Sequence, residues 1–143
     1  MEMYQQLFHQ FVASDDTLQV YDRDTLVFSS RQDRLLPLME YLDRWATHHR
    51  QVVIFDKITG NAAALLSVRA NCREVYSPLG SQIAVETFKK YGIKHHITKL
   101  VPYIQKDNGE DMCPMEKLSL DKEPEEFYQV MCHIIRQKGE NHG

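Results

Sequence analysis

Apolar residues recur three and four positions apart in four stretches of the chain, which is the spacing of one buried helix face. In the first stretch, Tyr4, Leu7, Phe8 and Phe11 form such a stripe. A fifth stretch is rich in alanine, and its small side chains favour a helix that packs closely against a sheet. The pattern therefore predicts helices over residues 2–12, 35–48, 60–68, 81–91 and 121–138.

Short runs of β-branched and aromatic residues between these helices predict strands. Two of them are separated only by Asp22-Arg23-Asp24, which predicts an antiparallel hairpin. The run Val52-Val53-Ile54-Phe55 has no polar alternation, which is typical of a strand buried on both faces of a parallel sheet. Strands are predicted at residues 17–21, 25–29, 52–55, 73–76 and 93–97, with an extended segment at 100–104.

The elements follow one another as α-ββ-α-β-α-β-α-β-α, the order of a three-layer α/β/α sandwich with a mixed sheet. Right-handed connections between parallel strands are expected to place helices on both faces of that sheet. The chain has 143 residues and contains no repeat and no Pro/Gly/Ser-rich linker. We therefore expect a single domain, residues 1–143, with a C-terminal helix at 121–138.

Composition mainly narrows the class of partner. Hydrophobic residues make up 43% and charged residues 26%, as in globular proteins with a core. The formal net charge of −3 gives no electrostatic reason to bind nucleic acid or an anionic membrane. No apolar run reaches the length of a membrane span, and the first residues lack the pattern of a signal peptide. The three cysteines form no CxxC pair, so we expect a cytoplasmic protein without disulfides.

The first candidate site follows the buried strand, in the segment Asp56-Lys57-Ile58-Thr59-Gly60-Asn61. Ligands of open α/β sheets bind outside the carboxyl ends of the strands, where helix N-termini present free N–H groups. Lys57 is suited to hold a phosphate or carboxylate, and Gly60 and Asn61 to line the approach. Asp56 is suited to accept a ribose hydroxyl or to act as a base. The alternative is that Asp56 caps the helix and Lys57 is solvated.

The second candidate follows the next predicted strand, in Ser77-Pro78-Leu79-Gly80-Ser81. Its two hydroxyls, on Ser77 and Ser81, lie at the equivalent end of the sheet in the predicted fold and are expected to assist ligand binding. The alternative is an ordinary loop in which Ser81 is the N-cap of the following helix.

A third candidate is Asp111-Met112-Cys113-Pro114-Met115-Glu116. A cysteine at the start of a short helix has its thiol pKa lowered by the helix dipole, and Glu116 is three residues away. This pattern makes Cys113 a candidate nucleophile and Glu116 a candidate acid or base. The alternative is a buried, inert cysteine with Glu116 completing a helix cap.

The seven histidines do not have the spacing of metal ligands. His95 and His96 are adjacent on a predicted strand, so their side chains point to opposite faces. No HxxxH, HExxH or CxxC motif occurs, nor do the glycine-rich nucleotide-binding motifs or GxSxG. We therefore expect no metal and no cofactor.

Several of these segments together resemble a small prokaryotic family of unknown function with a cytidine-deaminase-like fold. The resemblance rests on a DKxxGxAAA motif that begins at Asp56 and on the CPME motif at Cys113. It extends over residues 17–118, which it identifies as a deaminase-like core, and also involves residues 91–94, residues 100–104 and Asn108.

The resemblance implies the fold of nucleotide deaminases but not their chemistry. Deaminases hold zinc through an HxE or CxE motif and a PCxxC motif at the two helix starts discussed above. This chain has residues 56–62 and 77–81 at those positions, and neither segment offers a ligand set. Zinc-dependent deamination is therefore not expected.

The leading hypothesis is a zinc-free, deaminase-like protein that binds a nucleotide or a related phosphorylated or ribosylated small molecule. Whether it is also an enzyme stays open. One alternative is an enzyme that uses Cys113 as its nucleophile, with Asp56 or Glu116 as acid or base and Lys57 as an electrostatic stabiliser. Another is a non-catalytic module that forms a homodimer through an apolar stripe on the last helix, made of Phe127, Val130, Met131 and Ile134.

Overall fold

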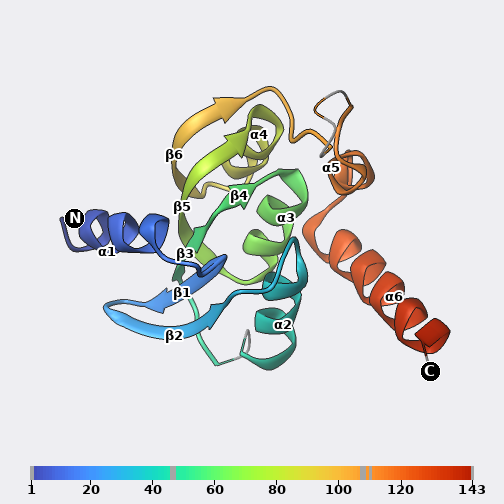
Figure 1. Cartoon of the computed structure of the whole chain (residues 1–143), viewed down its shortest axis with the longest axis horizontal. Coiled ribbons are helices and arrows are strands. Elements are labelled where there is room, and N and C mark those ends of the chain that lie inside the picture. The colour runs from blue at the N-terminus through green and yellow to red at the C-terminus, as the bar shows by residue number, and fades with distance from the viewer. Residues whose placement is uncertain (1, 46–47, 107–108, 110, 143) are drawn as a thin grey trace.

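The chain forms one mixed sheet with helices packed against it, as the computed structural model shows (Figure 1). The structure describes residues 2–45, 48–106, 109 and 111–142. Asn108, which contributed to the family resemblance, lies outside the described residues. The elements in chain order are α1 (Glu2–Ala13), β1 (Leu18–Asp22), β2 (Thr25–Ser30), α2 (Leu36–Arg44), β3 (Val52–Asp56), β4 (Ile58–Thr59), α3 (Asn61–Arg69), β5 (Cys72–Ser81), α4 (Gln82–Lys90), β6 (Lys94–Val101), α5 (Pro114–Ser119) and α6 (Pro124–His142).

The sheet is mixed, as predicted. Strand β1 pairs antiparallel with β2 and with β3, which confirms the hairpin. Strand β5 pairs in parallel with β3, β4 and β6. All five residues of β3 are buried, as its unbroken apolar run predicts. The carboxyl ends of β3, β5 and β6 therefore point the same way, and α3 and α4 begin there.

Helices cover both faces of the sheet, but for a different reason from the one predicted. One core lies between the sheet and α2, α3, α4 and α6, and includes Val20, Ile54 and Phe88. A smaller aromatic cluster joins α1 to the other face through Phe11, Phe55 and their neighbours. The connections β3-α3-β5 and β5-α4-β6 advance in one direction across the sheet, so their common handedness puts both helices on one face. The other face is covered by the N-terminal helix α1, which is no crossover.

Two strand predictions are wrong. Strand β5 continues through Ser77-Pro78-Leu79-Gly80-Ser81, which the sequence predicted as a loop. The pairing of Leu79 and Gly80 with β4 on one side and β6 on the other explains the difference. The segments at 93–97 and 100–104 form one strand, β6, that ends at Val101. The last helix begins at Pro124 rather than at Asp121.

None of the helices described is both long enough and apolar enough to cross a membrane.

Candidate functional site

The connection from β3 to α3 does not gather its polar side chains in one place. The Lys57 ammonium donates a hydrogen bond to the Ser14 carbonyl at 2.7 Å. It also lies 4.8 Å from the centroid of the Phe11 ring, so it belongs to the α1 side of the sheet. Lys57 therefore contacts the end of α1, not the start of α3.

Asp56 is buried, with 8% of its surface exposed. Burial raises its pKa from 3.8 to about 8, and backbone N–H donors at Ile58 and Lys57 offset only part of the effect. At neutral pH the uncharged carboxyl therefore predominates. Such a group can donate a proton or a hydrogen bond, but it is a poor partner for a cation.

The start of α3 is occupied by a side chain of the protein itself. Glu116 is 2% exposed. Its Oε1 accepts a hydrogen bond from the Asn61 backbone N–H at 2.5 Å, and its Oε2 accepts one from the Ile104 N–H at 2.6 Å. A carboxylate is stabilised at this position by the helix dipole and the free N–H groups of the first turn. Glu116 thus caps α3, whereas the sequence suggested a cap on its own helix.

Gly60 makes room for this carboxylate. A Cβ at Gly60 would lie 2.8 Å from Ile104 Cγ1 and 3.0 Å from Glu116 Oε1. The space next to Gly60, where the sequence predicted a ligand, is therefore filled by Ile104 and Glu116.

Asn61 connects three helices. Its Nδ2 donates to the backbone carbonyl of Ser119 at 3.2 Å and to the Ser119 hydroxyl at 3.0 Å. Its Oδ1 accepts a hydrogen bond from the Thr87 hydroxyl. The first residue of α3 is thus fixed to α4 and to the end of α5, and only 4% of Asn61 is exposed.

The two serines of β5 are buried and hydrogen-bonded within the strand and helix. The Ser77 hydroxyl donates to the Leu79 carbonyl at 2.8 Å. The Ser81 hydroxyl accepts from the Ala84 N–H at 3.0 Å, which confirms Ser81 as the N-cap of α4. Of the predicted site residues, Gly60, Asn61 and Glu116 therefore meet at the start of α3. Lys57, Ser77 and Ser81 have their hydrogen-bond partners elsewhere, whereas Cys113 is linked to Glu116 through the backbone of Ile104. The carboxyl of Asp56 accepts from the backbone of Lys57 and Ile58.

Cys113 immediately precedes the short helix α5, as predicted, and is half-buried. Its backbone N–H donates to the Ile104 carbonyl at 2.7 Å, which places it beside the capping contact. Both carboxylate oxygens of Glu116 already accept backbone hydrogen bonds. These two hydrogen bonds do not test whether Glu116 acts as an acid or base for Cys113, so that role stays a prediction.

A pocket of about 360 Å³ lies next to Asn61, between α3, α4 and the segment that joins α5 to α6. We call it the α3–α4 pocket. Its charged lining includes two lysines, Lys90 and Lys122, and three acids, Glu86, Asp121 and Glu123. It is further lined by Asn61, Leu65, Ile83, Thr87, Tyr91 and Leu120.

An ion pair spans part of this lining. The Glu123 carboxylate accepts a hydrogen bond from the Tyr91 hydroxyl at 2.5 Å and lies 3.6 Å from the Lys90 ammonium. These contacts lower the pKa of Glu123, so the carboxylate is ionised at neutral pH. The side chains of Lys90 and Glu123 are well exposed, and exposed ion pairs of this kind are easily exchanged for other partners.

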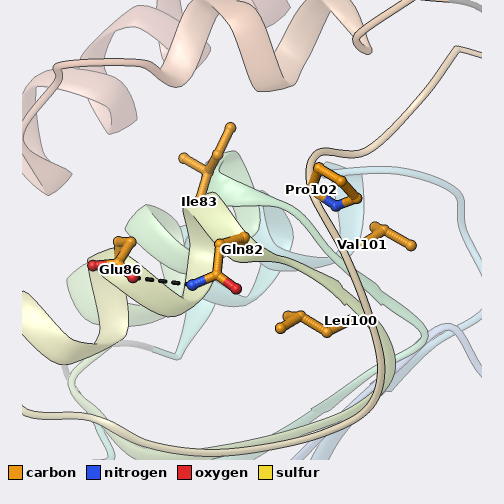
Figure 2. A pocket seen from close by; sticks show the side chains of 6 residues that line it. All are labelled: Gln82, Ile83, Glu86, Leu100, Val101 and Pro102. Atoms are coloured by element: carbon orange, nitrogen blue, oxygen red, sulfur yellow. Dashed lines mark hydrogen bonds between the residues drawn. The ribbon is translucent and has the colours of Figure 1, made fainter.

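A second hollow of about 510 Å³ adjoins the first and is largely apolar. Figure 2 shows Gln82, Ile83 and Glu86 of α4 on one side of it and Leu100, Val101 and Pro102, at the end of β6, on the other. Gln82 donates a hydrogen bond to Glu86 at 3.0 Å. Ile83 and Glu86 of α4 line both hollows.

Sequence reasoning found Asn61 but missed the rest of the α3–α4 pocket. Thr87 and Lys90 lie on a helix that was predicted correctly, and Tyr91 directly follows it, but nothing in that segment marks them as site residues. They become a lining only because residues 120–123 fold back over α3 and α4. In the described part of the chain, no three histidine, cysteine, aspartate or glutamate residues are grouped so that they could hold a metal ion.

The architecture is that of a mixed α/β sandwich, and comparison with known proteins shows which family it represents. A family model described as "Domain of unknown function (DUF1893)" matches residues 7–135, so the chain belongs to the DUF1893 family. The crystal structure of a DUF1893 family protein from Thermotoga maritima is similar in fold, with a TM-score of 0.82 and 24% sequence identity. The similarity covers 92% of this chain and 89% of the Thermotoga protein. The search of curated proteins returned no significant match.

Proposed function

We propose that this protein binds a nucleotide or a related phosphorylated or ribosylated small molecule in the α3–α4 pocket. The observation that carries the proposal is the lining of that pocket, in which Lys90, Lys122 and Tyr91 gather around the buried Asn61. Lysine ammonium groups bind phosphate, and carboxylates such as Glu86 accept hydrogen bonds from sugar hydroxyls. The volume of about 360 Å³ lies in the range of small-molecule sites.

The charge of the lining limits the ligand. The pocket lining contains two lysines and three acidic residues, and Lys90 already forms an ion pair with Glu123. A polyphosphate would meet excess negative charge. A nucleoside, a nucleoside monophosphate or a sugar phosphate fits this balance better, because at most one phosphate needs to be neutralised.

We further propose that the fold is of the cytidine-deaminase type, without zinc-dependent deamination. The β1–β2 hairpin followed by alternating strands and helices in one mixed sheet supports the fold assignment. The donor groups support the second part, because residues 56–62 and 77–81 offer no set of histidine and cysteine ligands at the starts of α3 and α4. The resemblance places the two zinc-binding motifs of deaminases at these helix starts. In this chain Glu116 caps the start of α3 and Ser81 caps the start of α4.

A thermal-shift experiment tests the proposed function. Purified protein is titrated with nucleosides, nucleoside monophosphates, nucleoside triphosphates, sugar phosphates and zinc. A ligand at ~100 times its Kd should stabilise the protein by ~2.7 kcal/mol. We expect monophosphates or nucleosides to give the largest shifts, and the Lys90→Met and Lys122→Met variants to reduce the shift caused by a phosphorylated ligand.

Lys57→Met is the matched control, because it removes the lysine of the site predicted from sequence. We expect it to retain the ligand-induced shift. Loss of the shift in Lys57→Met but not in Lys90→Met would move the site to the end of β3. The absence of any shift with these ligands would contradict the binding proposal, and a shift with zinc would contradict the zinc-free one.

A further inference from the structure

A second group of polar side chains lies on the opposite face of the sheet from the α3–α4 pocket. Tyr76 of β5 belongs to the aromatic cluster under α1. His96 of β6 stacks on the Tyr76 ring, with the centroids 4.2 Å apart and the planes at 17°. His95 instead stacks on Phe88 in the core of the other face, which confirms that the two histidines point in opposite directions.

A buried carboxylate holds the His96 ring. Glu74 of β5 has 8% of its side chain exposed, and its Oε2 lies 2.6 Å from His96 Nε2. The same oxygen accepts a hydrogen bond from the Tyr76 hydroxyl at 3.2 Å. Burial and the nearby Glu74 raise the pKa of Tyr76 to about 12, so this hydroxyl keeps its proton and keeps donating at neutral pH.

This arrangement selects one form of the His96 ring. Because a carboxylate oxygen accepts hydrogen bonds, the neutral imidazole at this position carries its proton on Nε2 and its lone pair on Nδ1. Nδ1 has no hydrogen-bond partner among the described residues, and 44% of the His96 side chain is exposed. The contact with Glu74 also fixes the orientation of the imidazole ring. His96 is thus an oriented nucleophile that solvent can reach.

Two permanent cations lie on the same two strands as this nucleophile and its carboxylate. Arg73 has its Nη1 4.0 Å from Glu74 Oε1 and its side chain 45% exposed. Lys94 pairs with Glu74 across the two strands and lies two residues before His96, on the same face of the sheet. Glu74 neutralises only one of these charges, so the surroundings of His96 attract an anionic reagent.

We propose that His96 accepts a phosphoryl group on Nδ1 from a small, energy-rich phosphoryl donor such as a phosphoramidate or an acyl phosphate. The Nδ1 lone pair forms the N–P bond while the bond between phosphorus and the leaving group breaks, and the leaving group departs with that electron pair. The proton on Nε2 moves to Glu74, so that the phosphorylated ring is neutral. Arg73 and Lys94 hold the phosphoryl oxygens, and Glu74 is a positioning residue.

The proposal is tested by incubating the full chain with potassium phosphoramidate near neutral pH. Intact mass and ³¹P NMR report the phosphohistidine, and peptide mapping assigns it. We expect His96 to be modified at least about tenfold faster than the exposed His9 and His133, in line with the effect of a carboxylate that orients an imidazole. His96→Gln should remove the fast phase, and His95→Gln should not.

Two further measurements separate this role from a merely structural ion pair. Glu74→Gln should slow the modification of His96 by phosphoramidate and also by diethyl pyrocarbonate, a neutral electrophile. The double variant Arg73→Met/Lys94→Met changes two exposed side chains. It also removes the hydrogen bond from Arg73 Nη2 to the Tyr4 hydroxyl at 3.3 Å, so circular dichroism first checks that the fold is kept. The double variant should slow the reaction with the anionic phosphoramidate but not the reaction with diethyl pyrocarbonate.

The proposal is overturned if His96 reacts with phosphoramidate no faster than His9 and His133. It is also overturned if the Arg73→Met/Lys94→Met variant reacts at the wild-type rate with both reagents. In either case the pair of His96 and Glu74 only joins β6 to β5.

Discussion

The Glu116 carboxylate caps a helix that begins 55 residues earlier in the chain, through the 2.5 Å hydrogen bond from the Asn61 N–H to Glu116 Oε1. The second oxygen of Glu116 accepts from Ile104, so one buried side chain fixes α5, the start of α3 and the segment after β6. Residues from two of the three predicted sites, Gly60 and Glu116, thereby meet. Their contact is an internal one, and the ligand site that we propose is the adjoining α3–α4 pocket.

Replacing Glu116 should therefore destabilise the fold. Glu116→Ala leaves two backbone N–H groups without their acceptor, and we expect the free energy of unfolding to fall by about 2–4 kcal/mol. Glu116→Gln keeps one carbonyl acceptor and should lose less. Urea denaturation measures both. Lys117→Ala, an exposed neighbour on the same helix, is the control and should change stability by less than about 0.5 kcal/mol. Equal stability of Glu116→Ala and Lys117→Ala would show that the cap contributes nothing.

Asp56 should make the fold less stable as the pH rises. Its folded-state pKa is about 8, against 3.8 for an ordinary aspartate. Between these values the folded protein keeps a proton that the unfolded chain has released, so the free energy of unfolding decreases with increasing pH. The full destabilisation by Asp56 is present above about pH 8, and none of it is present below about pH 4.

Asp56→Asn removes this titration. We expect the variant to be more stable than the wild type at pH 8 by a few kcal/mol, and the difference to shrink toward pH 4. Chemical denaturation at several pH values measures the difference. Asp33→Asn, at an exposed position, controls for the loss of one negative charge. A constant difference between Asp56→Asn and the wild type from pH 4 to pH 8 would mean that Asp56 does not titrate in this range.

Most of the fold could be predicted from periodicity, because the relevant interactions are local. The stripe in α1, the apolar run of β3 and the Ser81 cap of α4 each carry their own signal within a few residues. Residues 77–81 were mispredicted because proline, glycine and serine favour turns, whereas pairing with β4 and β6 on both sides decides their conformation.

The candidate site was less predictable because its contacts join distant parts of the chain. Asn61 was found from its place after a strand, but its partners Thr87 and Ser119 are 26 and 58 residues away. Lys57 was placed beside Asn61 by sequence proximity alone. The Lys57 side chain points to the face of the sheet that α1 covers. There its ammonium contacts the Ser14 carbonyl and the Phe11 ring. Sequence spacing could not predict which way the Lys57 side chain points, because the helix that it contacts, α1, lies more than 40 residues earlier in the chain.

The three cysteines should differ in reactivity. Cys72 is 4% exposed, and burial raises its pKa to about 12, whereas Cys113 and Cys132 are half-buried. Because the thiolate is the reactive form, we expect native protein at pH 8 to react quickly with Ellman's reagent at Cys113 and Cys132, and at Cys72 only on unfolding. The variants Cys113→Ser and Cys132→Ser assign the two fast phases. A third fast thiol in the native state would contradict this order.

The apolar stripe of α6 should serve the protein's own core. Phe127 is fully buried and Met131 is 6% exposed, both against the same core as α3, whereas Ile134 packs there only in part. Phe127→Ala should lower the free energy of unfolding by about 3–5 kcal/mol, because it leaves a cavity. Val130 is half-buried, so Val130→Glu should cost less and should leave the mass measured by sedimentation velocity unchanged. A wild-type dimer that becomes a monomer in Val130→Glu would instead support the homodimer that the sequence left open as an alternative. Deleting residues 121–143 could not make this distinction, because it removes Phe127 and Met131 from the core.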